Sequence, residues 1–212
     1  MNYSQLSTAI QQYCESTEQS FVDNIPNFVQ LAEERIYNSV QIPAIRKNVT
    51  GTMTQGFQYF QLPSDWLSTY SLAVIDPDTG EYEYLLNKDV NYIRAAYPPP
   101  NSVGKPQYYA IWNDTSMILG PTPDAAYTAE LHYYYYPVSI VDYGTSWLGT
   151  NFETVLLYGS IREAYIYLKG EQDMMNYYEQ KYQESLQLLK RLGDGLDRQD
   201  AYRSGQVRVK VT

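Results

Sequence analysis

Cysteine and histidine are almost missing from this chain of 212 residues, which has one of each, Cys14 and His132. A single cysteine excludes an internal disulfide bond and a cysteine-based metal cluster. A zinc site or a catalytic triad around His132 would need a further suitable partner, and the sequence has no second histidine. We therefore expect no metal, no cofactor and no histidine-based catalysis.

Other signatures of enzymes are missing as well. The glycine patterns of phosphate loops and dinucleotide-binding folds do not occur, since the segment from Gly51 to Gly56 has the wrong spacing. Neighbouring carboxylates such as Glu33 with Glu34 and Asp76 with Asp78 are typical of solvated helix faces and turns, and they do not indicate glycosidase chemistry. The sequence therefore predicts a protein that is not an enzyme.

Long apolar runs and an excess of positive charge are also lacking. No run is long enough to span a membrane, and the first residues lack the basic-then-apolar order of a signal peptide, so we expect folding in a cytoplasm and no membrane. The formal net charge of -9 argues against a protein that grips nucleic acid over its whole surface.

Tyrosine is unusually frequent, with 24 residues against 5 phenylalanines and 3 tryptophans. Tyrosine combines a large apolar ring with a hydroxyl that tolerates water, so an excess of it suits surfaces that become buried in interfaces. Tyrosines also fill the half-solvated faces of sheets. Both interpretations remain open at this point.

The clearest predicted element is a helical hairpin over residues 150–192. Its first arm, 151–169, has an apolar stripe that includes Leu157, Ile161 and Leu168, and Gly170 separates it from the second arm. A seam of residues at spacings of three and four predicts the buried face of the second arm. The seam comprises Met175, Tyr178, Tyr182, Ser185, Leu189 and Leu192.

Two further helices at the start of the chain would cover this hairpin. Residues 3–13 predict a short helix with Ser4 as its cap. A second helix follows from Phe21, and because Pro26 is tolerated only in a first turn, we expect regular helix from about Asn24. Residues 48–62 predict a two-stranded hairpin, and alternation and turn signals at 71–86, 108–119 and 127–136 predict further antiparallel strands.

Together these patterns predict an α+β fold. An antiparallel bundle of about four helices comprises residues 1–47 and 147–193, and an antiparallel, sandwich-like β-rich region at 48–146 is inserted into it. Residues 194–212, which have few apolar side chains, form an extended arm. Within the arm Val207, Val209 and Val211 alternate with basic residues, a pattern of strand addition to a partner or, alternatively, of a frayed end.

Several segments resemble head-to-tail adaptor proteins of short-tailed bacteriophages, the connector or tail tubular protein A-like family. The similar segments are FVQLAEERIY at 28–37, IPAIR at 42–46, GTM at 51–53, LPSDWL at 62–67, LYGS at 157–160 and the long helix that ends at Leu192. The resemblance implies a helical bundle with a β-rich insertion, a dodecameric ring in the neck of the virion and no enzyme activity.

The same resemblance implies partners and a site. The partners would be further copies of the chain, the portal protein, the tail nozzle or tube protein, and double-stranded DNA that passes without sequence preference through the ejection channel. The protein would be made in the cytoplasm of the bacterial host. Portal contact would fall to the C-terminal arm, at Arg198, Tyr202, Arg203, Val207, Arg208, Val209, Lys210 and Val211.

An alternative function follows from the tyrosine-rich strands. Tyr133–Tyr136, with Tyr108, Tyr109 and Trp112, could form a stacking platform for sugars in a tail-associated glycan-binding module. Against this, side chains along a strand point alternately to opposite faces, so alternate tyrosines are expected to face a core.

Overall fold

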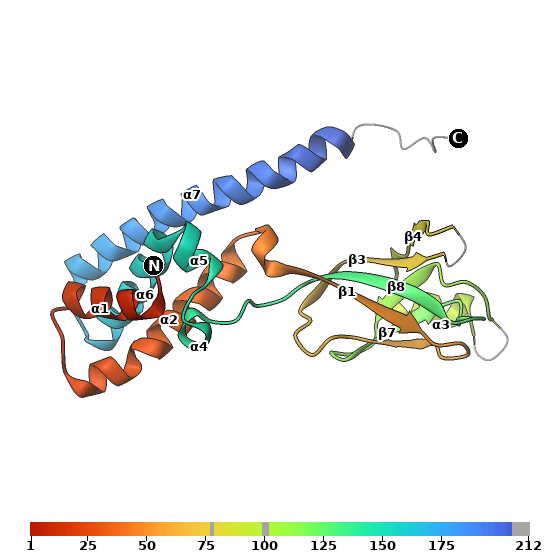
Figure 1. Cartoon of the computed structure of the whole chain (residues 1–212), viewed down its shortest axis with the longest axis horizontal. Coiled ribbons are helices and arrows are strands. Elements are labelled where there is room, and N and C mark those ends of the chain that lie inside the picture. Colours follow the sequence, from red (N-terminus) through yellow and green to blue (C-terminus); the bar gives the residue numbers. More distant parts are fainter. Residues whose placement is uncertain (77–78, 99–101, 205–212) are drawn as a thin grey trace. The chain divides into compact units, whose positions relative to one another are not determined.

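The computed structural model describes residues 1–76, 79–98 and 102–204, and it gives only the main chain for residues 194–204 (Figure 1). The fold is α+β, as the sequence predicts. The chain divides into two compact units. One, the helical unit, comprises Met1–Ile45 and Tyr136–Thr212, and the other, the β unit, comprises Arg46–Tyr135.

The helical unit is built on four longer helices, α1 (Tyr3–Tyr13), α2 (Gln19–Ser39), α6 (Glu153–Tyr167) and α7 (Gln172–Ser204). Short elements η1 (Pro43–Ile45), α4 (Ile140–Tyr143) and α5 (Trp147–Asn151) complete it. Helix α6 packs against α1, α2 and α7, so it lies at the centre of the bundle. The apolar stripes of these helices form its core, which includes Leu6, Ile10, Phe21, Ile25, Val29, Ile36, Leu156, Ile161 and Leu189.

Helix α2 begins earlier than the sequence predicts. It starts at Gln19, and Pro26 lies inside it rather than in its first turn. Proline lacks the N–H of the i→i−4 bond, which weakens a helix. Burial of Phe21, Ile25 and Phe28 on both sides of the proline offsets that loss, since tertiary packing supplies most of the stability of a helix in a protein.

The β unit contains two four-stranded sheets. The larger sheet has the order β1 (Arg46–Met53), β8 (Tyr127–Tyr134), β3 (Ser68–Ile75) and β4 (Tyr82–Tyr84), all antiparallel. The smaller sheet has the order β2 (Tyr59–Gln61), β7 (Ser116–Gly120), β6 (Tyr108–Ile111) and β5 (Leu86–Asn87), with β5 parallel to β6. Helix α3 (Val90–Ala96) contacts β6 and β7, and Ile93 packs with Ala110 and Ile118.

Residues 48–62 do not form the predicted hairpin. They supply β1 to the larger sheet and β2 to the smaller one, where β1 pairs with β8 and β2 with β7. The turn between them, with Gly56 at φ 75°, carries the chain from one sheet to the other. The alternation along this stretch therefore predicts the two strands correctly. Their partner strands lie far away in the sequence, so the local pattern cannot identify them.

The predicted helical hairpin is present as α6 and α7, with a break at Lys169 and Gly170. Helix α7 does not end at Leu192, however. It continues to Ser204, so the first eleven residues of the predicted extended arm are helical. Leucine, arginine, glutamine and alanine after Gly195 are good helix formers, which accounts for the continuation. Residues 205–212 lie outside the described part of the chain.

Candidate assembly surfaces

The seam predicted on α7 faces α6 over most of its length. Tyr178, Tyr182 and Leu189 are buried, as is Ser185, while Met175 is only partly buried. Leu186, which the spacing did not single out, is buried as well. Where Gly159 of α6 meets the ring of Tyr182, a β-carbon on the glycine would lie 3.3 Å from that ring. A residue without a side chain thus allows the close approach of the two helices.

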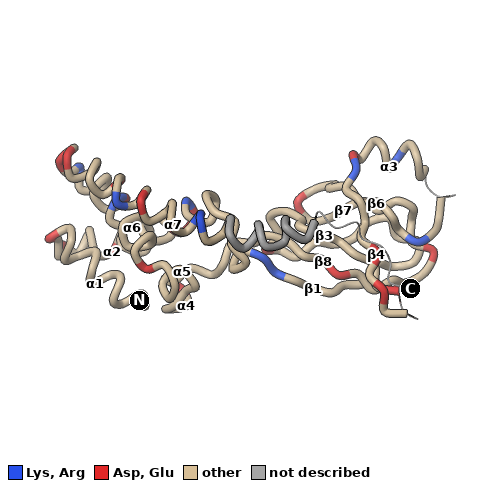
Figure 2. Tube along the Cα trace, turned by 90° about the horizontal axis from the view of Figure 1, so that it is seen from above, with Lys and Arg blue, Asp and Glu red and all other residues tan. Residues whose placement is uncertain are grey.

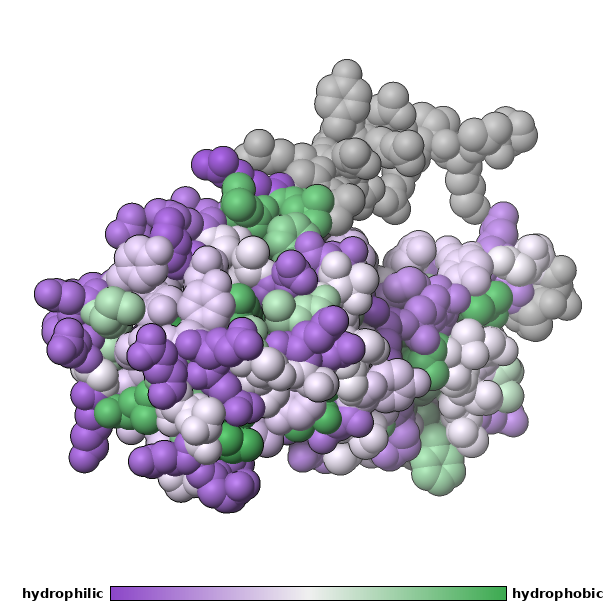
Figure 3. Space-filling view, turned by 60° about the vertical axis from the view of Figure 1, so that its left-hand side comes forward, coloured by the Kyte–Doolittle hydropathy of each residue, from purple (hydrophilic) through white to green (hydrophobic). Residues whose placement is uncertain are grey.

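Leu192 does not belong to the buried part of this seam, because its side chain is 40% exposed. The contact between the helices runs backwards along α6, from Tyr165 beside Tyr178 to Gly159 beside Tyr182. The next residue, Gly193, is buried against Gln41, so the packed face of α7 continues through Gly193 and leaves Leu192 beside it. Leu188 is also exposed, at 59%. Figure 3 shows a hydrophobic patch on the surface near the end of the described part of α7, the stretch that contains these two leucines.

A network of charged side chains joins helices α2, α6 and α7. Glu163 on α6 forms an ion pair with Arg35 on α2, at 2.9 Å, and accepts a hydrogen bond from its neighbour Arg162, at 2.8 Å. Arg162 also pairs with Glu179 on α7. The Glu163 side chain is 11% exposed, so the network is shielded from solvent more than the Lys181–Glu184 pair on the surface of α7. It fixes the register of α2, α6 and α7.

The structure places the residues of the predicted portal-binding arm in two groups. Arg198, Tyr202 and Arg203 lie on the main chain of α7. Val207, Arg208, Val209, Lys210 and Val211 lie outside the described residues. The assignment of the arm to the portal therefore stays a prediction.

The tyrosine-rich strands do not present a continuous platform. Tyr109 and Tyr133 are buried in the core of the β unit, and Tyr135 packs against the same core. The expected alternation along β8 accounts for this. Tyr136 belongs to the helical unit, where its hydroxyl donates to Asn38. Two of the seven side chains of the glycan-binding alternative are thus unable to stack on a ligand.

An exposed aromatic group remains on the smaller sheet. The Trp112 ring lies 5.7 Å from the Tyr59 ring, and the Arg94 guanidinium sits 4.5 Å from the centre of the indole. Both rings are about two fifths exposed. The stacked guanidinium covers part of the indole face, and stacking of this kind adds roughly 0.5–1 kcal/mol at an exposed site.

The outer face of the larger sheet carries a polar network. His132 and Glu130 of β8 contact each other at 2.8 Å, and the Tyr82 hydroxyl on β4 donates to Glu130 at 3.2 Å. The hydrogen bond with His132 is the main cause that lowers the pKa of Glu130. Asn48 on β1 meets His132 at 3.1 Å. The single histidine thus serves as a link across the strands.

Arg46 lies on the same outer face, at the start of β1. Its guanidinium sits 4.6 Å from the centre of the Tyr70 ring and 5.5 Å from that of Tyr134. Lys47, the next residue, pairs with Asp65 at 2.6 Å and lies over the Tyr135 ring. The hydrogen bond from Lys47 lowers the pKa of Asp65. Figure 2 shows Lys and Arg at the start of β1, and the ring contacts above make this corner of the β unit both basic and tyrosine-lined.

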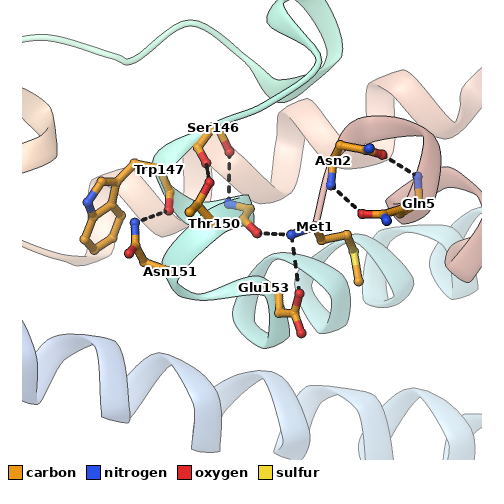
Figure 4. Close-up of polar contacts among 9 residues, drawn as sticks. Met1, Asn2, Gln5, Ser146, Trp147, Thr150, Asn151 and Glu153 are labelled. Atoms are coloured by element: carbon orange, nitrogen blue, oxygen red, sulfur yellow. Dashed lines mark hydrogen bonds and ion pairs between the residues drawn. The ribbon is translucent and has the colours of Figure 1, made fainter.

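The sequence reasoning missed α4 and α5, which anchor the return of the chain to the helical unit. Ser139 caps α4 and Ser146 caps α5, and a serine before a short apolar run was the available signal. Near α5, the amino group of Met1 donates to the Gly149 carbonyl and pairs with Glu153 at 3.4 Å (Figure 4). Asn2, not Ser4, caps α1, in a reciprocal capping box with Gln5.

One buried carboxylate ties α2 to α4. Glu33 accepts a hydrogen bond of 3.1 Å from the Ile140 N–H, and only 4% of the residue is exposed. Burial raises the pKa of Glu33, although its hydrogen bonds with Ser139 and Ile140 act in the opposite direction. It lines a cavity of about 380 Å³ together with Gln30, Glu34, Tyr37, Tyr136, Pro137 and Ser139.

Two classes of site were sought in the described part of the chain. No cluster of three or more histidine, cysteine, aspartate or glutamate side chains could hold a metal ion there. None of the described helices combines the length and the apolar character that a membrane span requires.

Comparison with known proteins identifies the family of the chain. A search of the curated proteins found no match. A protein-family model, described as SU10 adaptor protein, matches residues 1–210. The match spans both units and all the elements described above. The chain therefore belongs to the SU10 adaptor protein family, a family of phage head-to-tail adaptors.

Proposed function

We propose that this phage structural adaptor forms a ring in the neck of the virion, where it joins the portal to the tail nozzle and surrounds part of the channel for DNA ejection. The family match over residues 1–210 carries the proposal. We propose accordingly that the protein has no catalytic activity.

The architecture supports a subunit that contacts several partners at once. A ring requires two different, mutually complementary faces on each subunit, and a docking element is needed for each neighbouring ring. The exposed Leu188 and Leu192 on α7 offer an apolar strip on the helix that leads to the C-terminal arm. We propose that this strip and the arm at residues 194–212 contact the portal, while the ring, a dodecamer by the family resemblance, presents its other end to the nozzle.

The net charge suits a channel for DNA. Double-stranded DNA carries a dense negative charge, so an acidic lumen would repel it and avoid retention of the genome. We propose that the lumen of the ring is acidic. A structure of the assembled ring tests this directly, and a lumen lined mainly by lysine and arginine would contradict it.

The portal contact can be tested by truncation. We expect removal of residues 197–212 to leave a folded subunit, because the truncated chain keeps the buried face of α7 at Tyr178, Tyr182 and Leu189, and to abolish binding to portal rings. The full-length chain is the control, and a chain that lacks only 205–212 divides the arm, since it retains the full length of α7 with Arg198, Tyr202 and Arg203 but loses residues 207–211. Analytical ultracentrifugation of each protein with and without purified portal rings gives the readout. Unchanged binding of the 197–212 truncation would refute the role of the arm.

A further inference from the structure

Both edges of the larger sheet are uncovered. β1 and β4 are its outer strands, and among the described residues no strand pairs with their outer sides. In β1 only Met53 is buried, and all three residues of β4 are exposed. Natural edge strands are commonly guarded by a central charge or a proline. Residues 48–52 have neither, so β1 offers a long free edge to another strand.

The directions of the strands decide which neighbour fits. Each of the pairs β1–β8, β8–β3 and β3–β4 is antiparallel, so β1 and β4 run in opposite directions. A second copy that continues the sheet in the same orientation brings its β4 alongside β1 as an antiparallel partner. The same contact can then be repeated by every copy. Such a head-to-tail contact closes into a ring when the rotation between copies fits.

The register also shows which residues of β1 and β4 lie on the same side of the larger sheet. Leu131 and Val74 face the core of the β unit. Val49 is registered with Leu131, and Glu83 with Val74, so both lie on the core side of the sheet. Lys47 shares that side because it is two residues from Val49. In a continued sheet, Glu83 of one copy, which pairs with Lys105 of its own chain at 2.7 Å, would therefore lie on the same side as Lys47 of the next, which pairs with Asp65 at 2.6 Å. The contact between copies would join these two ion pairs through groups of opposite charge.

On the outer side of the sheet, a basic residue of β1 and the tyrosines of β4 are also complementary. Figure 2 shows Lys and Arg at the start of β1 and Asp and Glu around β4. Tyr82 and Tyr84 point to the outer side of the sheet, as does Arg46 at the other edge. The ring of Tyr84 is 61% exposed, and Arg46 already lies over two tyrosine rings. A tyrosine from a neighbour would extend this cation–π arrangement.

We propose that the larger sheet continues from one copy of the chain to the next, through antiparallel pairing of β4 with the β1 of its neighbour. The partner is a second copy of this chain, and the inference rests on the proposed ring. Backbone hydrogen bonds supply the contact, while the Glu83–Lys47 charges and the tyrosines on the outer side set its polarity. Tyrosines and charges on these strands thus act between subunits.

Disulfide trapping tests the pairing. In a Cys14→Ser background, we would introduce Glu83→Cys together with Lys47→Cys, and Glu83→Cys together with Val49→Cys, because the two β1 positions lie on one side of the strand and cover adjacent registers. Directly opposed residues place their β-carbons about 4.5–5.5 Å apart, within reach of a disulfide after small adjustment. Each protein is co-expressed with the portal protein of the same phage, and the complexes are purified, inspected by electron microscopy and oxidised.

The expected result is a ladder of disulfide-linked multimers from at least one double variant, and monomers only from Glu83→Cys or Lys47→Cys alone. Adaptor rings that show no ladder with either pair would overturn the sheet continuation and leave the proposed function standing. Dimers from Lys47→Cys or Val49→Cys alone would indicate pairing of β1 with another β1 and would also overturn it. If no adaptor ring assembles on the portal, the proposed function itself fails, and this inference fails with it.

Discussion

At the scale of single residues, one glycine determines how closely α7 packs within the helical unit. Gly193 sits inside α7 and is buried against the chain at Gln41 and Ile42. A β-carbon at this position would overlap the carbonyl oxygen of Gln41, which belongs to the main chain and cannot rotate away as a side chain can. The sequence predicts that the helical hairpin ends at Leu192, directly before this glycine. Its role is a close approach between α7 and the segment after α2.

We expect Gly193→Ala to lower the free energy of unfolding by about 1–3 kcal/mol, the usual cost of forcing a group into a packed site. Helix propensity alone predicts the opposite, a gain of about 1 kcal/mol from the loss of a glycine inside a helix. Urea denaturation followed by circular dichroism distinguishes the two. Lys190→Ala on the exposed side of the same helix is the matched control, and its effect should stay within about 0.5 kcal/mol. A stabilised Gly193→Ala protein would show that the main chain near Gln41 yields.

At the scale of elements, the sequence predicts best what depends on local periodicity. The α6–α7 hairpin and the β6–β7 pair follow from spacing and turn residues that lie within the segments themselves. The assignment of β1 and β2 to different sheets does not follow from such local signals. β1 pairs with β8 and β2 with β7, some 60–80 residues away, and no local pattern encodes these pairings. The start of α2 was misjudged because core packing overrode the cost of Pro26.

The candidate surfaces were predictable only in part. The spacing of Tyr178, Tyr182 and Leu189 identified a buried face, but at its end the buried residue is Gly193 and not Leu192. Gly193 packs against Gln41, a distant segment that the local sequence does not identify. The edges of a sheet are defined by the order of its strands, which depends on long-range pairing. β1 and β4 could therefore not be recognised as free edges before the topology was known.

The buried carboxylate of Glu33, which links α2 to α4, predicts that the stability of the protein depends on pH. The pKa of Glu33 is raised above its ordinary value of 4.5, so the folded protein binds a proton more tightly here than the unfolded chain does. Its contribution to stability is therefore fully present below pH 4.5 and is lost as the pH rises through the folded-state pKa. In Glu33→Gln the amide oxygen still accepts from Ile140 N–H, but no buried charge forms.

Glu33→Gln should consequently gain stability relative to the native protein as the pH rises from 4 to 8, with little difference at the acid end. Unfolding free energies from urea titrations at several pH values measure this difference. Glu34→Gln is the matched control, because Glu34 is the exposed neighbour on the same helix and should show no such trend. A difference that is constant with pH, or that shrinks as the pH rises, would contradict the burial of a charged Glu33.

At the scale of the whole molecule, two separate cores share one chain. The core of the β unit lies between its two sheets and includes Leu72, Leu131 and Met117, while the helical unit encloses its own apolar residues. Only two connections join the units in sequence, after Ile45 and after Tyr135. Arg46 pairs with Tyr134 in the ladder between β1 and β8, so the two ends of the β unit lie side by side. An insertion of this kind disturbs its host little, since its ends are close together.

We therefore expect residues 46–135 to fold as an independent protein. A domain of this size buries enough apolar surface to be stable alone, and its terminal residues are already paired with each other. The expected results are a β-type circular dichroism spectrum, dispersed amide resonances and one cooperative unfolding transition. The same fragment with Leu131→Asp places a charge in the core and should not fold, which provides the negative control. If the unmodified fragment is also unfolded while the full-length chain is folded, the β unit depends on the helical unit for its stability, and the two cores are not separate.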